Sequence, residues 1–207
     1  MSEINIQVYK NDLPDGLTFD GAVAIDTETL GLRVGRDRLC VCQVGDGKGN
    51  AWLVQFDGTD WSAPNLKKLL ADKAITKLFH FGRFDIAVLY HHLGVVTAPV
   101  FCTKIASKLS RTYAPRHGLK EICSELLGVN LDKQQQSSYW AAKELSEEQQ
   151  KYAANDVLYL HQLQAVLTER LKEQNRYDMA AAAFDYLPHR ALLDEAGWEE
   201  VDIFSHA

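Results

Sequence analysis

The stretch AVAIDTETLGL, residues 22–32, decides the fold. Small and branched apolar residues lead directly into Asp26, Thr27 and Glu28, a pattern typical of a buried strand that ends in two acids. Because residues i and i+2 of a strand share one face, Asp26 and Glu28 point the same way. Two like charges this close repel unless a cation lies between them. The stretch therefore indicates a site rather than ordinary surface.

The composition indicates one α/β domain. The chain has 207 residues, of which 46% are hydrophobic and 24% charged, and no apolar run reaches membrane-spanning length. We expect no signal peptide and no membrane partner, because the opening residues lack a basic region followed by an apolar block. Four cysteines without CxxC spacing are expected to be buried reduced thiols of a cytoplasmic protein, not zinc ligands or disulfides.

The charge pattern contains one basic segment in an acidic chain. The net charge of −6 argues against a broad nucleic-acid surface. Residues 101–120 nevertheless contain no Asp or Glu and hold Lys104, Lys108, Arg111, Arg116, His117 and Lys120. On charge alone, a solvated helix face is the simpler interpretation. Local binding of a phosphate chain is the alternative.

The periodicity predicts a mostly antiparallel strand meander, followed by alternating helices and strands. Strands are expected at residues 4–10, 22–26, 39–45, 50–56, 74–81 and 99–103, with a hairpin turn at 46–50. Helices are expected at residues 63–72, 83–94, 104–110, 118–128 and from Ser146, which opens a capping box, to about Asn175. This order predicts an α/β fold, with a mixed sheet flanked by helices.

The end of the chain is expected to form a tail. Pro188 should break or kink the last helical region. The tail from about residue 188 holds the apolar residues Trp198, Ile203 and Phe204. We expect these residues to pack on this chain or on a neighbouring subunit. Residues 1–207 are thus predicted to form one domain with a C-terminal tail.

Two further acids stand in apolar surroundings. Asp85 follows a predicted strand by one helical turn, and Asp156 shares an inward helix face with Tyr152 and Tyr159. Each acid alone is equally well explained as a capping or hydrogen-bonded residue. Together with Asp26 and Glu28 they indicate a metal site, because charges are rarely buried without partners. All-oxygen ligands favour Mg²⁺ or Mn²⁺, and four carboxylates can hold two such ions about 4 Å apart for phosphodiester cleavage.

These motifs, in this order, resemble the DEDDy class of 3′→5′ exonucleases. The matching segments are DTE at 26–28, HFGRFD at 80–85 and YAAND at 152–156. Further segments, such as FCTKIASKLSRTY at 101–113 and KQQQSSYW at 133–140, extend the similarity over nearly the whole chain and resemble the compact, ribonuclease D-like nanoRNase C enzymes. The resemblance implies a ribonuclease H-like fold. It also implies that Asp26, Glu28, Asp85 and Asp156 bind two divalent cations, and that Tyr152 orients the attacking water.

The resemblance further implies a substrate and an assembly. The expected substrates are short oligoribonucleotides, down to dinucleotides with 5′-phosphorylated ends, which are hydrolysed to 5′-mononucleotides; DNA is left open. The expected assembly is an octameric ring. One competing hypothesis is the same chemistry on longer RNA or DNA, as in tRNA trimming or repair. Another is a non-catalytic nucleic-acid-binding module, which the presence of all four acids and the tyrosine disfavours.

Three candidate substrate contacts lie near the acids. Leu32 stands where a leucine of related oligoribonucleases wedges between the last two bases; the alternative is an ordinary core or turn leucine. Thr27 lies between two acids, so its backbone can contact the terminal nucleotide. His80 precedes the second motif and can line the pocket, although a hydrogen-bonded histidine at a strand end is an equal interpretation.

Further candidate contacts come from two polar segments. The basic segment supplies Arg111, Tyr113, Arg116, His117 and Lys120, and its arginine forks suit a terminal phosphate. The alternative is pairing with the sheet's own acids or with a neighbouring subunit. Residues 133–140 supply Lys133, Gln136, Ser137 and Trp140. Amides and hydroxyls suit ribose and phosphate, and aromatic rings stack on bases. The alternative for this second segment is an ordinary polar loop.

Overall fold

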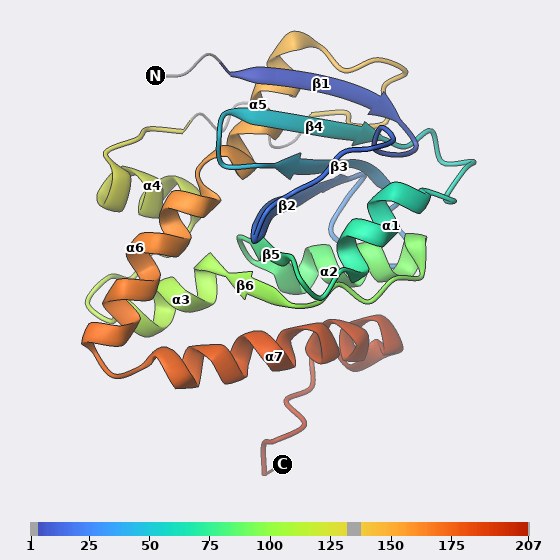
Figure 1. The fold of residues 1–207 in the computed structure, drawn as a ribbon. Coiled ribbons are helices and arrows are strands. Elements are labelled where there is room, and N and C mark those ends of the chain that lie inside the picture. Colours follow the sequence, from blue (N-terminus) through green and yellow to red (C-terminus); the bar gives the residue numbers. More distant parts are fainter. Residues whose placement is uncertain (1–3, 132–137, 207) are drawn as a thin grey trace.

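A six-stranded mixed sheet forms the centre of the molecule (Figure 1). The computed structural model describes residues 4–131 and 138–206. The strands are β1 Asn5–Lys10, β2 Ala22–Thr29, β3 Leu39–Gly45, β4 Asn50–Gln55, β5 Thr76–Phe79 and β6 Val100–Cys102. Their order in the sheet is β1-β4-β3-β2-β5-β6. The predicted mixed sheet flanked by helices is confirmed.

The antiparallel part of the sheet is formed by β2, β3 and β4. This agrees with the predicted meander and its hairpin. The first strand departs from it, because β1 lies parallel to β4 at the sheet edge. On the other side, β5 and β6 extend the sheet in parallel from β2. β2 is therefore a central strand, buried between an antiparallel and a parallel neighbour.

Helices cover both faces of β2. The α-helices of the described residues are α1 Pro64–Ala71, α2 Gly82–Leu93, α3 Thr103–Ser110, α4 Leu119–Leu127, α5 Glu147–Leu158, α6 Leu160–Glu173 and α7 Tyr177–Leu193. Neighbouring residues of a strand point to opposite faces. Asp26 approaches Asp156 of α5, whereas Thr27 bonds to Asp85 of α2. The helices α5 and α2 therefore lie on opposite faces of this strand.

The predicted long helix from Ser146 is two helices. The capping box is confirmed, since Ser146 Oγ accepts from Gln149 N at 3.2 Å and Gln149 Oε1 accepts from Ser146 N at 3.0 Å. The chain then turns at Tyr159, which ends α5 and precedes α6. A single helix to Asn175 was thus wrong. The turn lets Leu160 and Leu163 of α6 enter the core.

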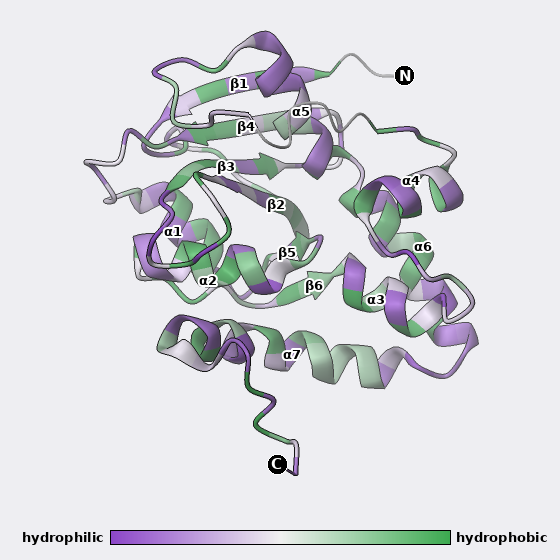
Figure 2. Ribbon diagram, turned by 180° about the vertical axis from the view of Figure 1, so that it is seen from behind, coloured by the Kyte–Doolittle hydropathy of each residue, from purple (hydrophilic) through white to green (hydrophobic). Residues whose placement is uncertain are grey.

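A close approach brings α5 onto the sheet. An ideal Cβ at Gly45 would lie 3.1 Å from Cβ of Val157, which is tighter than most contacts, so the glycine lets the helix settle next to β3. Val157 is buried, and its neighbour Asp156 is carried to the end of β2. Figure 2 shows hydrophobic residues concentrated on the central strands, with hydrophilic residues more frequent on the surrounding helices and loops. None of the helices in residues 4–131 and 138–206 is long and apolar enough to cross a membrane.

The last long helix runs through Pro188 without ending. α7 continues to Leu193 and is followed by a π-helical turn, η1 Asp194–Trp198. Of the predicted break or kink at Pro188, the break is therefore wrong. Pro188 is buried with Leu187 and Ala191, and this packing overrides the proline's poor helix propensity.

The tail after η1 is attached to its own domain through its backbone. Arg83 and Arg190 both pair with Asp194 and donate to the Glu199 carbonyl oxygen at 2.7 and 3.0 Å. The Phe204 ring lies 5.7 Å from that of Tyr186. Even so, the predicted tail residues are accessible: Trp198 is 50%, Ile203 45% and Phe204 76% exposed.

Candidate metal centre and substrate cleft

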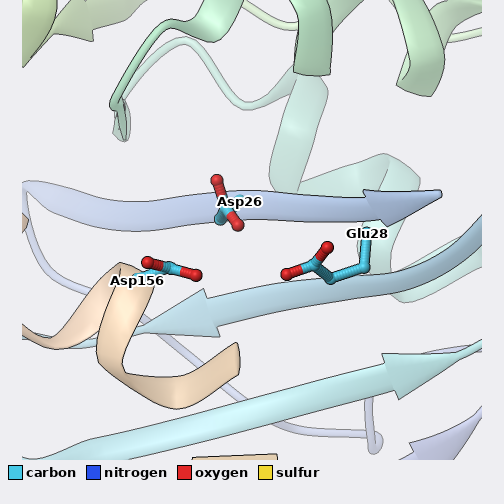
Figure 3. Close-up of side chains that lie close together, drawn as sticks. All are labelled: Asp26, Glu28 and Asp156. Carbon is cyan, nitrogen blue, oxygen red and sulfur yellow. The ribbon is translucent and has the colours of Figure 1, made fainter. Parts of the chain in front are cut away.

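Three carboxylates converge at the end of β2. Asp26 and Glu28 project from one face of the strand, and Asp156 projects toward them from α5 (Figure 3). One oxygen from each lies within 4.8 Å of the others. The structure thus brings together three residues that are separated by up to about 130 positions in the sequence, as the motifs predicted.

The fourth acid reaches the site from the opposite face of the strand. Gly82 starts α2 so close to β5 that an ideal Cβ there would lie 2.6 Å from Cβ of Phe79. This packing places Asp85 in the first helical turn, where it is only 4% exposed. The Thr27 hydroxyl donates to Asp85 Oδ1 at 2.6 Å. Asp85 lies outside the three-carboxylate group but lines the same cleft.

Burial and mutual repulsion favour the protonated forms of these acids. Burial, followed by the charges of Asp156 and Asp85, raises the pKa of Glu28 to about 9. Burial raises the pKa of Asp85 to about 7, although the Thr27 hydrogen bond acts in the opposite direction. Burial, followed by the charge of Asp85, raises the pKa of Asp26 well above its ordinary value. Each ionised carboxylate is therefore costly without a counterion.

The carboxylates fit a hard divalent cation. In the described part of the chain, no Lys or Arg forms an ion pair with Asp26, Glu28 or Asp85. Carboxylate oxygens are the preferred ligands of Mg²⁺ and Mn²⁺. A bound cation would compensate the repulsion that raises these pKa values.

Tyr152 lies one helical turn before Asp156. Burial, followed by the charge of Asp156, raises the pKa of its phenol. The Trp140 ring packs 5.9 Å from the Tyr152 ring and is 2% exposed. Gln149 Nε2 fixes the segment before Trp140 by donating to Ser138 Oγ at 2.7 Å. Tyr152 is therefore a neutral hydrogen-bonding group of restricted orientation.

A cleft of about 640 Å³ opens beside the acids. Thr27, Leu32, His80 and Trp140, all predicted as substrate contacts, line it. His80 Nδ1 bonds to Thr103 Oγ1 at 2.9 Å, and Leu32 is 85% exposed. The structure therefore places four of the predicted contacts at the cleft, one of them as a free apolar side chain at its rim.

Other predicted contacts lie outside the cleft lining. Arg111 is buried, with 1% of its surface exposed, and its guanidinium binds the Glu125 carboxylate. Tyr113 donates to the same carboxylate at 2.6 Å, and His117 Nδ1 bonds to Ser107 Oγ at 2.9 Å. Arg116 is exposed but does not line the cleft either. Arg111 therefore pairs with an acid of its own chain, but this acid lies on α4 and not on the sheet. Lys133, Gln136 and Ser137 lie outside the described residues.

The sequence analysis did not select Lys104 and Phe81 as substrate contacts, although both residues line the cleft. Lys104 and Lys120 belong to the basic segment and line the cleft, whereas Arg111 and Arg116 of the same segment do not. Lys104 Nζ lies 4.2 Å from the centroid of the Phe81 ring, which is 47% exposed. The basic segment correctly indicated positive charge at the cleft. The positions of its residues along the helix did not reveal which basic side chains pair with acids outside the cleft. Phe81 gave no separate signal within the HFGRFD motif.

Comparison with known proteins identifies the architecture. The 3′-5′ exonuclease family matches residues 7–172. Brucella melitensis NrnC bound to pGG has a TM-score of 0.95 and 58% identity, covering 99% of this chain and 100% of that one. The same protein with bound Mg²⁺ gives a TM-score of 0.94 and 57% identity, with coverage of 99% and 100%.

The chain is also similar in sequence to a curated relative, of which it matches only a part. Ribonuclease D of Acidiphilium cryptum (strain JF-5) is 35% identical over 170 residues, which are 82% of this chain and 43% of that protein. The chain spans less than half the length of the first ribonuclease D relatives that it matches. The predicted similarity to ribonuclease D-like exonucleases and to nanoRNase C is confirmed.

Proposed function

Because this chain belongs to the 3′-5′ exonuclease family, we propose that it hydrolyses short single-stranded oligoribonucleotides to 5′-mononucleotides. The observation that supports the chemistry is the convergence of four acids on one cleft, three of them within 4.8 Å of one another. The support for short substrates is the similarity to Brucella melitensis NrnC, which was solved bound to pGG.

The four acids divide into two overlapping ligand sets. Asp26, Glu28 and Asp156 would hold one divalent cation, and Asp26 with Asp85 a second. Two such ions, Mg²⁺ or Mn²⁺, supply a nucleophile at neutral pH and neutralise charge on the attacked phosphate. The similarity to NrnC with bound Mg²⁺ supports a divalent ion here.

Tyr152 contributes orientation rather than proton removal. Its raised pKa keeps the phenol neutral throughout the physiological range. A neutral hydroxyl beside Asp156 can hold an attacking water by a hydrogen bond. Packing against Trp140 restricts the ring, so that the hydroxyl is already in place when substrate binds.

The cleft offers separate contacts for bases and phosphates. Leu32 and Phe81 expose apolar surface at its rim, where bases can stack or be separated. Lys104 and Lys120 provide positive charge in the same lining and suit a substrate phosphate. A cleft of about 640 Å³ is of the size that encloses a small ligand rather than a folded RNA.

The tail suggests how copies of this chain associate. We propose that residues 1–207 act as one exonuclease domain in a homo-oligomer, an octameric ring by resemblance. The exposed tail residues Trp198, Ile203 and Phe204 support a contact with a neighbouring subunit, because several exposed apolar side chains in one short segment are typical of a protein–protein contact.

The decisive experiment is a substrate-length series on protein of measured oligomeric state. A 5′-labelled RNA dinucleotide, a longer single-stranded RNA and a DNA of matched length are incubated with Mn²⁺ or Mg²⁺. We expect release of 5′-mononucleotides, fastest from the dinucleotide, and none in EDTA or with Asp26→Asn.

Each other outcome points to a different function. Rapid cleavage of long RNA or DNA with an intact dinucleotide would replace the proposal by trimming or repair activity. Binding of every substrate without cleavage, in the presence of either metal, would indicate a non-catalytic module.

A further inference from the structure

A buried amide faces the first acid of the cluster. Gln43 of β3 is directly opposite Asp26 of β2 in the antiparallel register, so both side chains lie on the same face of the sheet. Gln43 is completely buried, and its Nε2 donates to Asp26 Oδ2 at 3.2 Å. An ionised carboxylate can only accept hydrogen bonds, which requires the NH₂ end of the amide on this side.

The other end of the same amide has no partner. Gln43 Oε1 is buried without a hydrogen bond in the described structure. Gln55 on the adjacent strand is a useful contrast, because its Oε1 accepts from Lys10 Nζ at 2.6 Å and its Nε2 donates to Ala142 O at 2.7 Å. A buried, unsatisfied carbonyl oxygen lowers stability. Folding alone would be served better by an apolar residue at position 43.

The ionised form of Asp26 is opposed by the neighbouring acids. It faces the charges of Asp85, Asp156 and Glu28, all of which act against its ionised form. Repulsion from three sides favours rotation of the carboxylate away from the cluster. A neutral amide can oppose this rotation without introducing a positive charge, which would compete with a cation for the same oxygens.

We propose that Gln43 is a positioning residue that holds the Asp26 carboxylate in the orientation needed to bind divalent cations. The inference rests on the proposed function, because it assigns a role in the same metal site. Gln43 is not among the residues that line the cleft. It acts through Asp26 and occupies only one of the two oxygens of that carboxylate.

The test compares Gln43→Leu with the matched variant Gln55→Leu in the full chain. Mn²⁺ binding is measured by titration calorimetry, and Tm is measured in EDTA. For Gln43→Leu we expect Mn²⁺ affinity to fall by about 10- to 100-fold. Its Tm in EDTA should equal or exceed that of the wild type, because the unsatisfied oxygen is removed. For Gln55→Leu we expect the reverse: a lower Tm with unchanged Mn²⁺ affinity.

Kinetics supply a further readout. The Mn²⁺ concentration for half-maximal activity should rise in Gln43→Leu, whereas KM for the oligoribonucleotide at saturating Mn²⁺ should stay the same. Gln43→Met, which keeps the side-chain length and removes the donor, should behave like Gln43→Leu and serves if the leucine variant does not fold.

The outcomes that overturn the inference are distinct. Wild-type Mn²⁺ affinity in Gln43→Leu or Gln43→Met would exclude a positioning role while leaving the proposed function intact. A parallel loss of Tm and affinity would make Gln43 an ordinary structural residue. If the wild type itself bound no Mn²⁺ or Mg²⁺, the proposed metal-dependent function would fail, and the role of Gln43 with it.

Discussion

The hydroxyl of Thr27 donates a 2.6 Å hydrogen bond to Oδ1 of Asp85 and thereby joins β2 to the first turn of α2. Both residues are buried, at 8% and 4% exposure. Thr27 lies between Asp26 and Glu28 and points to the opposite face of the strand. The strand β2 therefore contributes Asp26 and Glu28 to the three-carboxylate cluster, and its opposite face orients Asp85 through Thr27.

Replacing this hydroxyl should reduce activity without disrupting the fold. Thr27→Val keeps the branched shape but leaves Asp85 without its donor. We expect kcat to fall by about 10- to 100-fold, because the carboxylate loses its fixed orientation. Thr27→Ser retains the donor and should stay close to the wild type. The rate of mononucleotide release at saturating Mn²⁺ measures both, and equal rates for the two variants would contradict the role of the hydrogen bond.

The raised carboxyl pKa values predict how the metal-free protein responds to pH. Glu28, with a pKa of about 9, and Asp85, with a pKa of about 7, bind protons more tightly in the native than in the unfolded state. The free energy of unfolding should therefore fall as pH rises through the interval from the unfolded-state pKa values to these native ones. Glu28→Gln should flatten this decline.

Chemical denaturation in EDTA at acidic, neutral and alkaline pH tests this expectation. The control is Glu147→Gln, an exposed acid on the same helix as Asp156, which should leave the slope unchanged. Added Mn²⁺ should reverse the trend for the wild type, because cation binding requires ionised carboxylates. A wild-type stability that rises with pH in EDTA would contradict the cited pKa directions.

The sequence predicted those features that depend on local pattern. The apolar run before Asp26 identified β2, and alternation placed Asp26 and Glu28 on one face. Ser146 and Gln149 identified the start of α5, since both halves of a capping box lie within one turn. The acids of the site could be predicted because each is held by a strand or helix whose position follows from its own neighbours.

Features that depend on distant contacts were missed. The Arg111 side chain is of a type that binds phosphate, but it is paired with Glu125. Glu125 lies on α4, and only the fold brings the two residues together. The turn at Tyr159 contains neither Gly nor Pro, so nothing in the local sequence distinguished two helices from one. The parallel position of β1 beside β4 likewise follows from the packing of the whole sheet.

The tyrosine should affect the chemical step more than binding. Tyr152→Phe removes the hydroxyl, whose pKa responds to the Asp156 charge, but keeps the ring that packs on Trp140. We expect kcat to fall by about 100-fold or more, with little change in KM or Mn²⁺ affinity. Calorimetry and steady-state kinetics on the same preparation separate these effects. A weakened Mn²⁺ affinity would instead show that the hydroxyl supports Asp156 as a ligand.

Basic residues that line the cleft should affect KM for the substrate, whereas an exposed basic residue outside the cleft should not. Lys104 and Lys120 line the cleft, whereas Arg116 is exposed beyond it. Lys104→Gln and Lys120→Gln should each raise KM for a 5′-phosphorylated dinucleotide by about 10-fold, the loss expected for one charge-assisted hydrogen bond. Arg116→Gln, which changes the net charge equally, should leave KM near that of the wild type.

A dinucleotide without the 5′-phosphate identifies which phosphate the lysines bind. If they hold the terminal phosphate, the penalty of either lysine substitution should disappear with this substrate, because the group that they contact is already absent. If they hold the phosphate under attack, the penalty should persist. An equal rise in KM for Arg116→Gln and the lysine variants would show that the general electrostatic field of the protein causes the effect. It would contradict direct contacts between the two lysines and the substrate.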